Sequence, residues 1–523
     1  MTGEKSVGRS RLCSVKAWWA LALALAVNVP ATVYTARSTL QAFPNSGDEY
    51  AYLLSARLFA GGRLSVPSPE PAKFFSLAHV INDGRFFGKY PPGWPLALTL
   101  GVWLDVPWLV NPLLGALTLI VIFVFARRFF SLPVANAAML LSLLCPFFIF
   151  ESASFFSHPL CLLFVTLAAY FLFAAAEPAA PASPASPGSR PAAPFIAGLA
   201  AGAAFLARPY TAVAVLLPLG IYVAALFVRR RDWRGLMRLC LWAFAAFSIM
   251  LGLFFLYNFL QTGSPFRQPF VQYEYTRSSD HMLFTTKWTA IKFKELGLER
   301  WLSMASWTGW CPLLLLVFLA WRRGGDDGAR GRGLALAWLC LILTLAYLLF
   351  PGTGWAQYGP RYLYEIWFAV LILAAVGLLA LGRAAPVALA IVLALNGYKF
   401  AQATHFYGKQ VAERTQLFKL TKERKLDRAV VFVSSGINSM HVQDLPRNGL
   451  RFDGPVLFAR DLGPQKNRLL LAKYPDRRFY TFWFDYDTRQ GRIEPYWELR
   501  PEAFKARQEL AIRLANREPR YLK

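Results

Sequence analysis

The sequence predicts an all-α polytopic membrane protein with about 11 transmembrane helices, followed by a small C-terminal α/β domain. Of its 523 residues, 56% are hydrophobic and only 16% are charged, whereas soluble chains carry about 25% charged residues. The hydrophobic residues gather in runs of roughly 18 to 22, the length that a helix needs to cross a bilayer. This pattern excludes a disordered chain, a disulfide-stapled secreted domain and an ordinary cytosolic enzyme.

The formal net charge of +26 first suggests a nucleic-acid partner, but the placement of the basic residues argues against one. Most Lys and Arg lie beside apolar runs, where they orient spans and meet anionic headgroups. The six cysteines form no CxxC pair, so neither a disulfide framework nor a zinc site is expected. The expected partner of the basic residues is therefore the lipid bilayer.

The first apolar run, Ala17 to Tyr34, follows a basic tail at residues 1–16, which we expect in the cytoplasm. This run is longer than the hydrophobic region of a signal peptide, which favours an uncleaved first span over a cleaved leader. The apolar runs that we interpret as spans are 17–35, 94–127, 132–150, 159–176, 195–207, 210–228, 236–260, 304–321, 333–350, 361–381 and 384–401.

Basic clusters between the runs orient the spans, because short cytoplasmic loops are rich in Lys and Arg. Four clusters fall on the cytoplasmic side if 94–127 is one span preceded by a short interfacial helix. Two short spans in that stretch would put most of them outside. The clusters are Arg127-Arg128, residues 229–238, the group Arg322, Arg323, Arg330 and Arg332, and Arg383.

This topology divides the chain into a transmembrane domain over residues 17–401 and an external α/β domain over residues 402–523. It leaves two long external loops, 36–93 and 262–303. The Ala/Pro/Ser stretch 177–194 becomes a cytoplasmic linker, because its proline density prevents a helix.

The C-terminal segment differs in kind from the rest of the chain. It carries 24 Lys and Arg against 14 Asp and Glu, which favours contact with anionic headgroups. Three β-rich runs lie between helical stretches, at Ala429–Val433, Pro455–Ala459 and Phe479–Phe484. These alternations predict a small α/β domain.

The first external loop contains a helix signal. Ser46 and Glu49 have the spacing of a capping box, and Gly61-Gly62 ends the pattern. Between them lies an apolar stripe that predicts an amphipathic interfacial helix, formed by Tyr50, Leu53, Leu54 and Leu58.

Asp48 and Glu49 at the start of this helix have two interpretations. Glu49 can cap the helix while Asp48 complements the helix dipole, which accounts for both without any function. Alternatively, one of them is catalytic. Neighbouring helical residues point about 100° apart, so the two cannot share a proton and would have different tasks.

Lys89 lies in the segment Gly84–Leu98, just before the double proline Pro91-Pro92 that starts the next helix. Its ammonium group could extend to lipid headgroups as an anchor. Alternatively, it binds the phosphate of a lipid whose tail runs down the spans.

A span, an external Asp-Glu pair that opens a helix, and a Lys-x-Pro-Pro before the next span resemble the C-type glycosyltransferase (GT-C) superfamily. The nearest branch is glycosyltransferase family 39, with the protein O-mannosyltransferases and the bacterial aminoarabinose transferase of lipid A. The resemblance covers roughly residues 15–400 in architecture, and in sequence only these short motifs. Tyr90, between the Lys and the prolines, departs from the family pattern, and the C-terminal segment lacks the carbohydrate-binding insertion of eukaryotic O-mannosyltransferases.

The resemblance implies roles for three residues. Asp48 corresponds to the external Asp that acts as base or binds the acceptor, Glu49 to its acidic neighbour, and Lys89 to the Lys that contacts the donor phosphate. A divalent cation held through Glu49 is compatible with the sequence, but no cofactor is required.

Arg208 and Arg361 lie at the outer ends of spans, against the charge trend. A guanidinium beside Pro and Tyr suits bidentate phosphate binding, although plain headgroup anchoring would also explain it. The sequence Gly359-Pro360-Arg361-Tyr362-Leu363 is similar to an Arg-Tyr pattern at this place in family members, which favours phosphate binding by Arg361 and a substrate contact by Tyr362.

Glu151 and His158 flank a short outer turn, and Pro159 follows as a natural first helical residue. Helix capping explains His158 without function. A role of either residue as acceptor or phosphate ligand is the alternative.

The resemblance implies a membrane glycosyltransferase. Heavy use of Ala, Arg and Pro, with no organellar signal, favours a bacterial inner membrane, with the 402–523 domain in the periplasm. The implied enzyme would move a sugar from a polyprenyl-phosphate donor to an acceptor hydroxyl of a glycan, lipid or protein. A transporter or flippase for a lipid-linked or anionic substrate is the main alternative, although such proteins carry ionisable groups near the bilayer midplane. A non-catalytic scaffold is a third.

Overall fold

The computed structural model describes residues 18–177, 192–277, 297–320, 327–350, 357–434, 444–485 and 488–496. The predicted cytoplasmic tail 1–16, most of the linker 177–194, the central part of the loop 262–303 and the end of the C-terminal segment lie outside these ranges.

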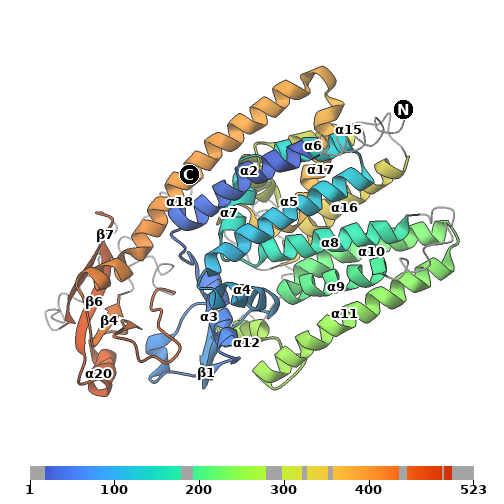
Figure 1. The fold of residues 1–523 in the computed structure, drawn as a ribbon. Coiled ribbons are helices and arrows are strands. Elements are labelled where there is room, and N and C mark those ends of the chain that lie inside the picture. The colour runs from blue at the N-terminus through green and yellow to red at the C-terminus, as the bar shows by residue number, and fades with distance from the viewer. Residues whose placement is uncertain are drawn as a thin grey trace, which may run out of the picture.

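A bundle of long apolar helices makes up most of the molecule (Figure 1). Among the described residues, eight helical segments are long and apolar enough to cross a membrane, and the bent pair α6–α7 brings the number to nine. The helices of the bundle are α2 (Trp19–Tyr34, extended by the π-helix η1, Thr35–Thr39), α5 (Val110–Phe129, preceded by η3, Pro107–Leu109), α6 (Leu132–Leu141), α7 (Pro146–Ala153), α8 (His158–Ala176), α9 (Ala192–Ala207), α10 (Pro209–Arg229), α11 (Trp233–Thr262), α14 (Glu299–Trp307), α15 (Cys311–Ala320), α16 (Asp327–Leu349), η5 (Arg361–Ile366), α17 (Trp367–Ala380), η6 (Gly382–Ala384) and α18 (Ala385–Glu423).

Every predicted span has a helix at its position, but two predicted spans are shorter than expected. The run at 195–207 is the short apolar helix α9, and the run at 304–321 is divided between α14 and α15. The backbone between these two turns through Gly309 and Trp310, with φ of 58° and 62°. A total of eleven spans therefore stays a prediction.

The run at 132–150 was expected to form one straight helix. It forms instead the two helices α6 and α7, whose axes are bent by 72°. Pro146 starts α7 and has no N–H to continue the α6 hydrogen-bond ladder. Asn28 forms a hydrogen bond with the backbone at the bend, because its Oδ1 accepts from the Leu144 N–H at 3.0 Å. Asn396 Nδ2 donates to the Leu143 carbonyl at 3.1 Å.

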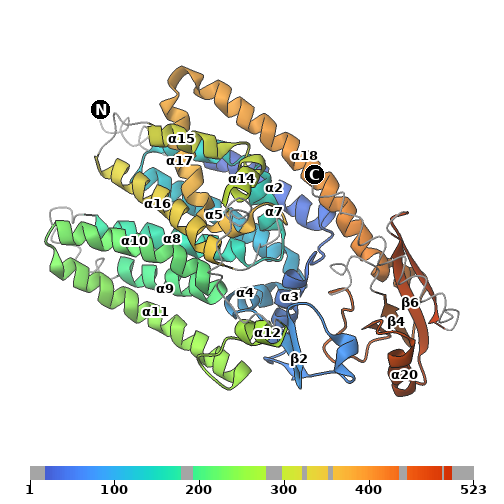
Figure 2. The ribbon, with the colours of Figure 1, turned by 180° about the vertical axis from the view of Figure 1, so that it is seen from behind.

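Short elements gather at one end of the bundle, between it and the C-terminal sheet (Figures 1 and 2). A three-stranded antiparallel sheet in the order β1-β3-β2 packs against α3, with Phe86 of β3 paired to Val66 and Asn82. The elements at this end are α3 (Gly47–Ala60), β1 (Val66–Pro67), η2 (Ala72–Phe75), β2 (Val80–Asp83), β3 (Arg85–Gly88), α4 (Gly93–Trp103) and α12 (Pro269–Arg277).

Two expectations for residues 45–109 are confirmed, and one is wrong. Helix α3 starts after its N-cap Ser46 and ends at Gly61, and α4 is a separate short helix before α5. However, α3 is not amphipathic. Its residues from Glu49 to Ala56 are all buried, because α4, the small sheet and the bundle enclose the helix.

The C-terminal segment contains the predicted strands in a four-stranded sheet of order β5-β4-β6-β7. The central strand β4 is parallel to β5 and β6, and β7 closes the sheet antiparallel to β6. Helix α18 continues without a break from the bundle to this sheet and packs against β7. The elements are β4 (Ala429–Val433), β5 (Val456–Arg460), α20 (Pro464–Lys473), β6 (Arg478–Asp485) and β7 (Gln490–Pro495).

Candidate functional site

Helix α3 begins with the capping box that the sequence predicts. The Ser46 Oγ accepts a hydrogen bond from the Glu49 N–H at 3.2 Å, and Glu49 Oε2 accepts one from the Asn45 N–H at 2.8 Å. These bonds satisfy backbone groups that have no partner within the helix. They fix the first turn, and with it the position of Asp48.

Glu49 is fully buried, and both of its carboxylate oxygens accept hydrogen bonds. Oε1 accepts from the Phe155 N–H at 2.9 Å, so the side chain joins α3 to the turn between α7 and α8. Burial raises the pKa of Glu49 to about 7, and the hydrogen bonds from Phe155, Ser46 and Asn45 oppose this rise. This geometry favours a positioning role for Glu49 over contact with a substrate.

Asp48 is partly exposed, and its carboxylate is surrounded by donors. Oδ1 accepts a hydrogen bond from the Tyr90 hydroxyl and lies 3.6 Å from His79 Nε2, while Oδ2 lies 3.4 Å from both terminal nitrogens of Arg361. Burial acts to raise the pKa of Asp48, but His79, Arg361 and the Tyr90 hydrogen bond outweigh it and hold the pKa well below its usual range. Asp48 is therefore an anion that neighbouring cations stabilise.

His79 is a site residue that the sequence reasoning missed. Its backbone has φ of 63°, the left-handed region that a non-glycine residue rarely adopts. The His79 N–H donates to the Tyr273 hydroxyl at 2.8 Å, and the His79 carbonyl accepts from the Lys89 N–H at 3.1 Å.

Only a glycine fits at position 47, because a Cβ there would lie 2.9 Å from that of Ala78 and 3.1 Å from the His79 ring.

Strand β3 lies directly against α3, and this contact places Lys89 near Asp48. A Cβ at Gly88 would lie 2.5 Å from Ser55 Oγ and 2.7 Å from the Ala51 carbonyl, so only glycine allows the two backbones to approach so closely. Position 89, directly after Gly88, is therefore held close to the second and third turns of α3.

Lys89 is buried in an aromatic cage. Its Nζ lies 4.4 Å from the ring centroids of Phe270 and Tyr273, both on α12, and 5.5 Å from that of Tyr90. Ring faces attract an ammonium group. The alternative in which Lys89 reaches out to headgroups does not describe this side chain, which is buried and lies against the aromatic rings of α12.

Arg361 and Tyr362 start η5, after a turn in which Gly359 has φ of 99°. The Arg361 guanidinium lies 4.5 Å above the Phe156 ring while it faces Asp48. The Tyr362 ring stacks on that of Tyr347, 4.5 Å away and 13° from parallel. Arg361 therefore points into the protein, where packing fixes it.

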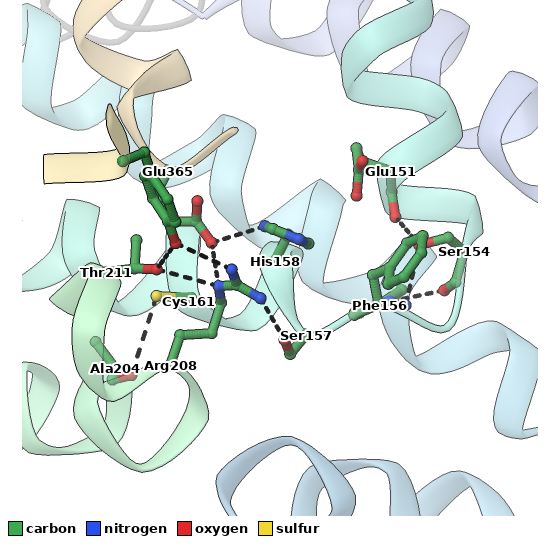
Figure 3. A network of polar contacts seen from close by, with 12 residues as sticks. Glu151, Ser154, Phe156, Ser157, His158, Cys161, Ala204, Arg208, Thr211 and Glu365 are labelled. Atoms are coloured by element: carbon green, nitrogen blue, oxygen red, sulfur yellow. Dashed lines mark hydrogen bonds and ion pairs between the residues drawn. The ribbon is translucent and has the colours of Figure 1, made fainter. Parts of the chain in front are cut away.

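Arg208 belongs to a second network, shown in Figure 3. Its Nε lies 3.0 Å from Glu365 Oε1, an oxygen that also lies 2.9 Å from His158 Nδ1. Arg208 also donates to Ser157 Oγ and to the Tyr347 hydroxyl, both at 3.2 Å. No sequence motif predicts a role for Glu365, which lies four residues after Arg361. His158 contacts this carboxylate and makes no side-chain cap on α8.

Glu151 on α7 is buried at the same end of the bundle (Figure 3). Within the part of the chain that the structure describes, neither of its carboxylate oxygens has a hydrogen-bond partner. The charged groups that act on it are Arg361, Glu365, Glu49 and Arg208. Glu151 is thus a buried acidic group within electrostatic range of Arg361, Arg208 and Glu49.

Two tyrosines connect the Asp48 cluster to the Arg208 network. The Tyr52 hydroxyl lies 3.0 Å from Ser157 Oγ, which accepts from Arg208. The Tyr52 ring stacks on the ring of Tyr90, 4.3 Å away, and the Tyr90 hydroxyl donates to Asp48. The two clusters therefore form one continuous site.

Three arginines surround one tyrosine in this site. The guanidinium carbons of Arg208, Arg300 and Arg361 lie 5.8, 5.3 and 5.7 Å from the Tyr362 ring centroid. Arg300, in the first turn of α14, was not predicted, because a single Arg near the start of an apolar run looks like a headgroup anchor. Converging guanidinium groups repel one another, so this arrangement is suited to an anionic ligand.

All eight predicted site residues thus meet at one end of the bundle, although Asp48 and Arg361 are 313 residues apart in sequence. The partly exposed carboxylate of Asp48 lies near the Lys89 ammonium and the Arg361 guanidinium, and further guanidinium groups belong to the same continuous site. Among the described residues, no group of three or more His, Cys, Asp or Glu side chains is arranged to hold a metal ion. At this end of the bundle, cationic side chains therefore lie close to a carboxylate that can accept hydrogen bonds.

The bundle, the short helices at one end of it and the small C-terminal sheet together form a GT-C fold, as the sequence motifs predict. The structure is similar to that of ArnT, an aminoarabinose transferase from Cupriavidus metallidurans, bound to undecaprenyl phosphate, with 16% identity and a TM-score of 0.54. The match covers 90% of this chain and 89% of that one.

Two further solved structures are similar. Apo ArnT from the same organism is 15% identical, with a TM-score of 0.53 over 82% of this chain and 84% of that one. An oligosaccharyltransferase from Archaeoglobus fulgidus is 12% identical, with a TM-score of 0.46 over 88% and 68%. No protein-family model and no curated protein matches the chain. At these identities the similarity shows the fold.

Proposed function

We propose that this protein is a membrane glycosyltransferase that moves a sugar from a polyprenyl-phosphate donor to an acceptor hydroxyl. The site lies at the end of the bundle opposite the basic loop 229–233, the side that charge placement assigns to the periplasmic face of a bacterial inner membrane. The N-terminus is then cytoplasmic, and the four-stranded sheet is periplasmic.

The observation that carries the proposal is that Lys89 and Arg361 lie close to Asp48, while contacts through Ser157 and Tyr52 link Arg208 to the same site. These cations come from three separate segments and gather at one end of apolar helices, where a lipid phosphate would lie with its chain along the bundle. The similar ArnT structure, which holds undecaprenyl phosphate, supports a lipid-phosphate donor.

In the proposed reaction, the acceptor oxygen forms a bond to the anomeric carbon as the bond from that carbon to the phosphate oxygen breaks. The electron pair of the broken bond leaves with the polyprenyl phosphate, and the acceptor proton passes to Asp48. Lys89, Arg361 and Arg208 stabilise the departing phosphate, where each such contact contributes on the order of 2–4 kcal/mol to the transition state.

The two contacts between Arg361 and Asp48, at 3.4 Å, are long for a charge-assisted pair. We expect a donor phosphate to attract Arg361 and so release Asp48 for the acceptor hydroxyl. The cations lower the pKa of Asp48, so the released carboxylate would be a better proton acceptor than the one paired here. This order makes donor binding precede proton removal.

The reaction as proposed requires no cofactor. A divalent cation between Asp48 and the donor phosphate is the alternative, with Glu49 as a further ligand. Both Glu49 oxygens already accept hydrogen bonds, which disfavours that role. A chelator titration of activity distinguishes the two.

The test uses purified protein in lipid nanodiscs with a panel of polyprenyl-phosphate sugars and candidate acceptors. Mass spectrometry measures released polyprenyl phosphate and glycosylated acceptor. We expect Asp48→Asn and Lys89→Ala to lower the rate by about 100-fold or more. The exposed residues Asp105 and Lys73 provide matched controls, and Asp105→Asn and Lys73→Ala should keep the wild-type rate.

Equal release by wild type and by both site variants would refute the site assignment. The buried ionisable groups Glu151, Glu365 and His158 favour the transporter alternative, since such groups mark transport pathways in membrane proteins. Movement of intact lipid-linked sugar across the bilayer, without release of polyprenyl phosphate, would support that alternative.

A further inference from the structure

The segment that leads into α3 has a strained backbone. Gln41 and Ala42 are consecutive non-glycine residues with φ of 53° and 49°, in the left-handed region. Such conformations persist only where the surrounding structure holds them. The segment starts directly after the first span and ends at the turn that carries Asp48.

Helix α18 holds this segment from one side. The Thr415 hydroxyl donates to Gln41 Oε1 at 3.3 Å, and Asn45 Nδ2 donates to Gln410 Oε1 at 2.8 Å. Both partners on α18 lie beyond residue 401, in the part of the helix that leads to the C-terminal sheet.

Arg447 of the C-terminal domain also contacts this segment. Its Nη2 donates to the Pro44 carbonyl at 2.8 Å. The guanidinium carbon lies 4.3 Å from the ring centroid of Phe43 and 4.6 Å from that of Tyr50, so the planar group lies between residues on both sides of the α3 N-cap. A displacement of Arg447 would therefore release both sides of the turn that positions Asp48.

Asp444 fixes Arg447 in this place. Its carboxylate is buried and lies 2.6 Å from Nη2 of Arg447 and 2.6 Å from Nη2 of Arg414, and its carbonyl accepts from Arg447 Nε at 2.7 Å. Two guanidinium groups this close repel each other unless an anion lies between them. Asp444 is that anion.

We infer that the C-terminal domain positions the catalytic helix, with Asp444 and Arg447 as positioning residues that hold the first turn of α3 and thereby Asp48. The inference rests on the proposed function for its kinetic consequence. Neither residue touches a substrate. Loss of the contact should therefore lower kcat, because Asp48 is displaced, and leave KM for the donor unchanged, because Lys89 and Arg208 are held elsewhere.

The kinetic test compares four full-length variants in nanodiscs. Asp444→Asn and Arg447→Lys should lower kcat about tenfold, since a displacement near 1 Å is enough for such losses, with KM for the donor within twofold of wild type. Asp444→Glu keeps the charge and should restore part of kcat. The matched control is Asp476→Asn, which removes an exposed ion pair with Arg428 on the same domain.

Hydrogen exchange measured by mass spectrometry provides a readout that needs no enzymatic activity. We expect faster exchange at residues 43–50 in Asp444→Asn and Arg447→Lys, with the protection of β4 unchanged. If Asp444→Asn also speeds exchange in β4, a second variant is needed. Phe43→Leu removes the ring that contacts Arg447 and lies outside the C-terminal domain, so it should speed exchange at residues 43–50 alone.

The two hypotheses fail in different ways. Hydrogen exchange at the wild-type rate over residues 43–50 in Asp444→Asn, Arg447→Lys and Phe43→Leu would overturn the positioning role, whether or not the protein is active. Unchanged kcat in an active enzyme, or a loss confined to KM, would also overturn it. Faster local exchange in a protein without transferase activity would refute the proposed function and leave the contact intact.

Discussion

At the scale of single residues, Asp48 and Glu49 are neighbours with opposite surroundings. Asp48 is partly exposed and faces cations, while Glu49 is enclosed and accepts hydrogen bonds at both oxygens. The capping box and the divergence of the two side chains could be predicted from spacing alone. The bond from Glu49 to Phe155 could not, because it joins residues 106 apart in the sequence.

The raised pKa of Glu49 predicts a pH dependence of stability. Burial raises this pKa from 4.5 to about 7, so between these values the folded protein holds a proton that the unfolded chain lacks. Stability should therefore fall as the pH rises from 4.5 to 7, by on the order of 3 kcal/mol. In Glu49→Gln this part of the pH dependence should disappear.

Thermal unfolding in detergent between pH 4.5 and 8 measures this effect. Glu70→Gln is the control, since the Glu70 side chain is exposed, and it should keep the wild-type slope. Equal slopes in wild type and Glu49→Gln would show that Glu49 has the same protonation in the folded and unfolded states.

At the scale of elements, the break between α6 and α7 shows the limit of hydropathy. The apolar run is continuous, so it predicts one span, and Pro146 was the only local signal of a break. The break is stabilised by residues far away in the sequence. Asn28 and Asn396 form hydrogen bonds with the backbone groups that the bend leaves unpaired. Such polar residues are needed because no water reaches these groups inside a membrane.

Asn28→Leu should therefore destabilise the protein by about 1–3 kcal/mol, because it leaves the partly buried Leu144 N–H without its side-chain acceptor. Asn136 on α6 provides a matched control. Among the described residues its Oδ1 has no hydrogen-bond partner, so Asn136→Leu should cost little. Denaturant or thermal unfolding in the same detergent compares them, and an equal loss in both variants would contradict the role of Asn28.

At the scale of the whole molecule, the order of helices and the C-terminal strands could be predicted from apolar runs, charge and β-rich segments. The convergence of Arg208, Arg300, Arg361 and Glu365 on one end of the bundle could not. It depends on which helices pack together, and that choice follows from side-chain complementarity between distant segments. The aromatic cage of Lys89 was missed for the same reason, because Phe270 and Tyr273 come from α12, far from Lys89 in the sequence.

The contact between the C-terminal domain and the membrane domain should weaken in acid. Burial acts to raise the pKa of Asp444, but Arg414 and Arg447 outweigh it and lower the pKa. The stabilisation by this carboxylate is therefore present above the ordinary pKa of about 4 and is lost as the pH falls below it. The difference in thermal midpoint between wild type and Asp444→Asn should be largest at pH 7 and should shrink towards pH 3. A difference that is independent of pH would contradict this charge effect.

Helix α18 sets the reach of the C-terminal domain. Its 39 residues, at 1.5 Å each, extend about 58 Å, nearly twice the ~30 Å thickness of the hydrocarbon core. One inserted residue between the membrane and Thr415 would rotate everything beyond it by about 100° and raise it by 1.5 Å. A flexible loop could adjust its conformation to such an insertion, but a continuous helix transmits the rotation and the rise to everything that follows it. The number of residues in this helix therefore sets the height and rotational phase at which Arg447 meets α3.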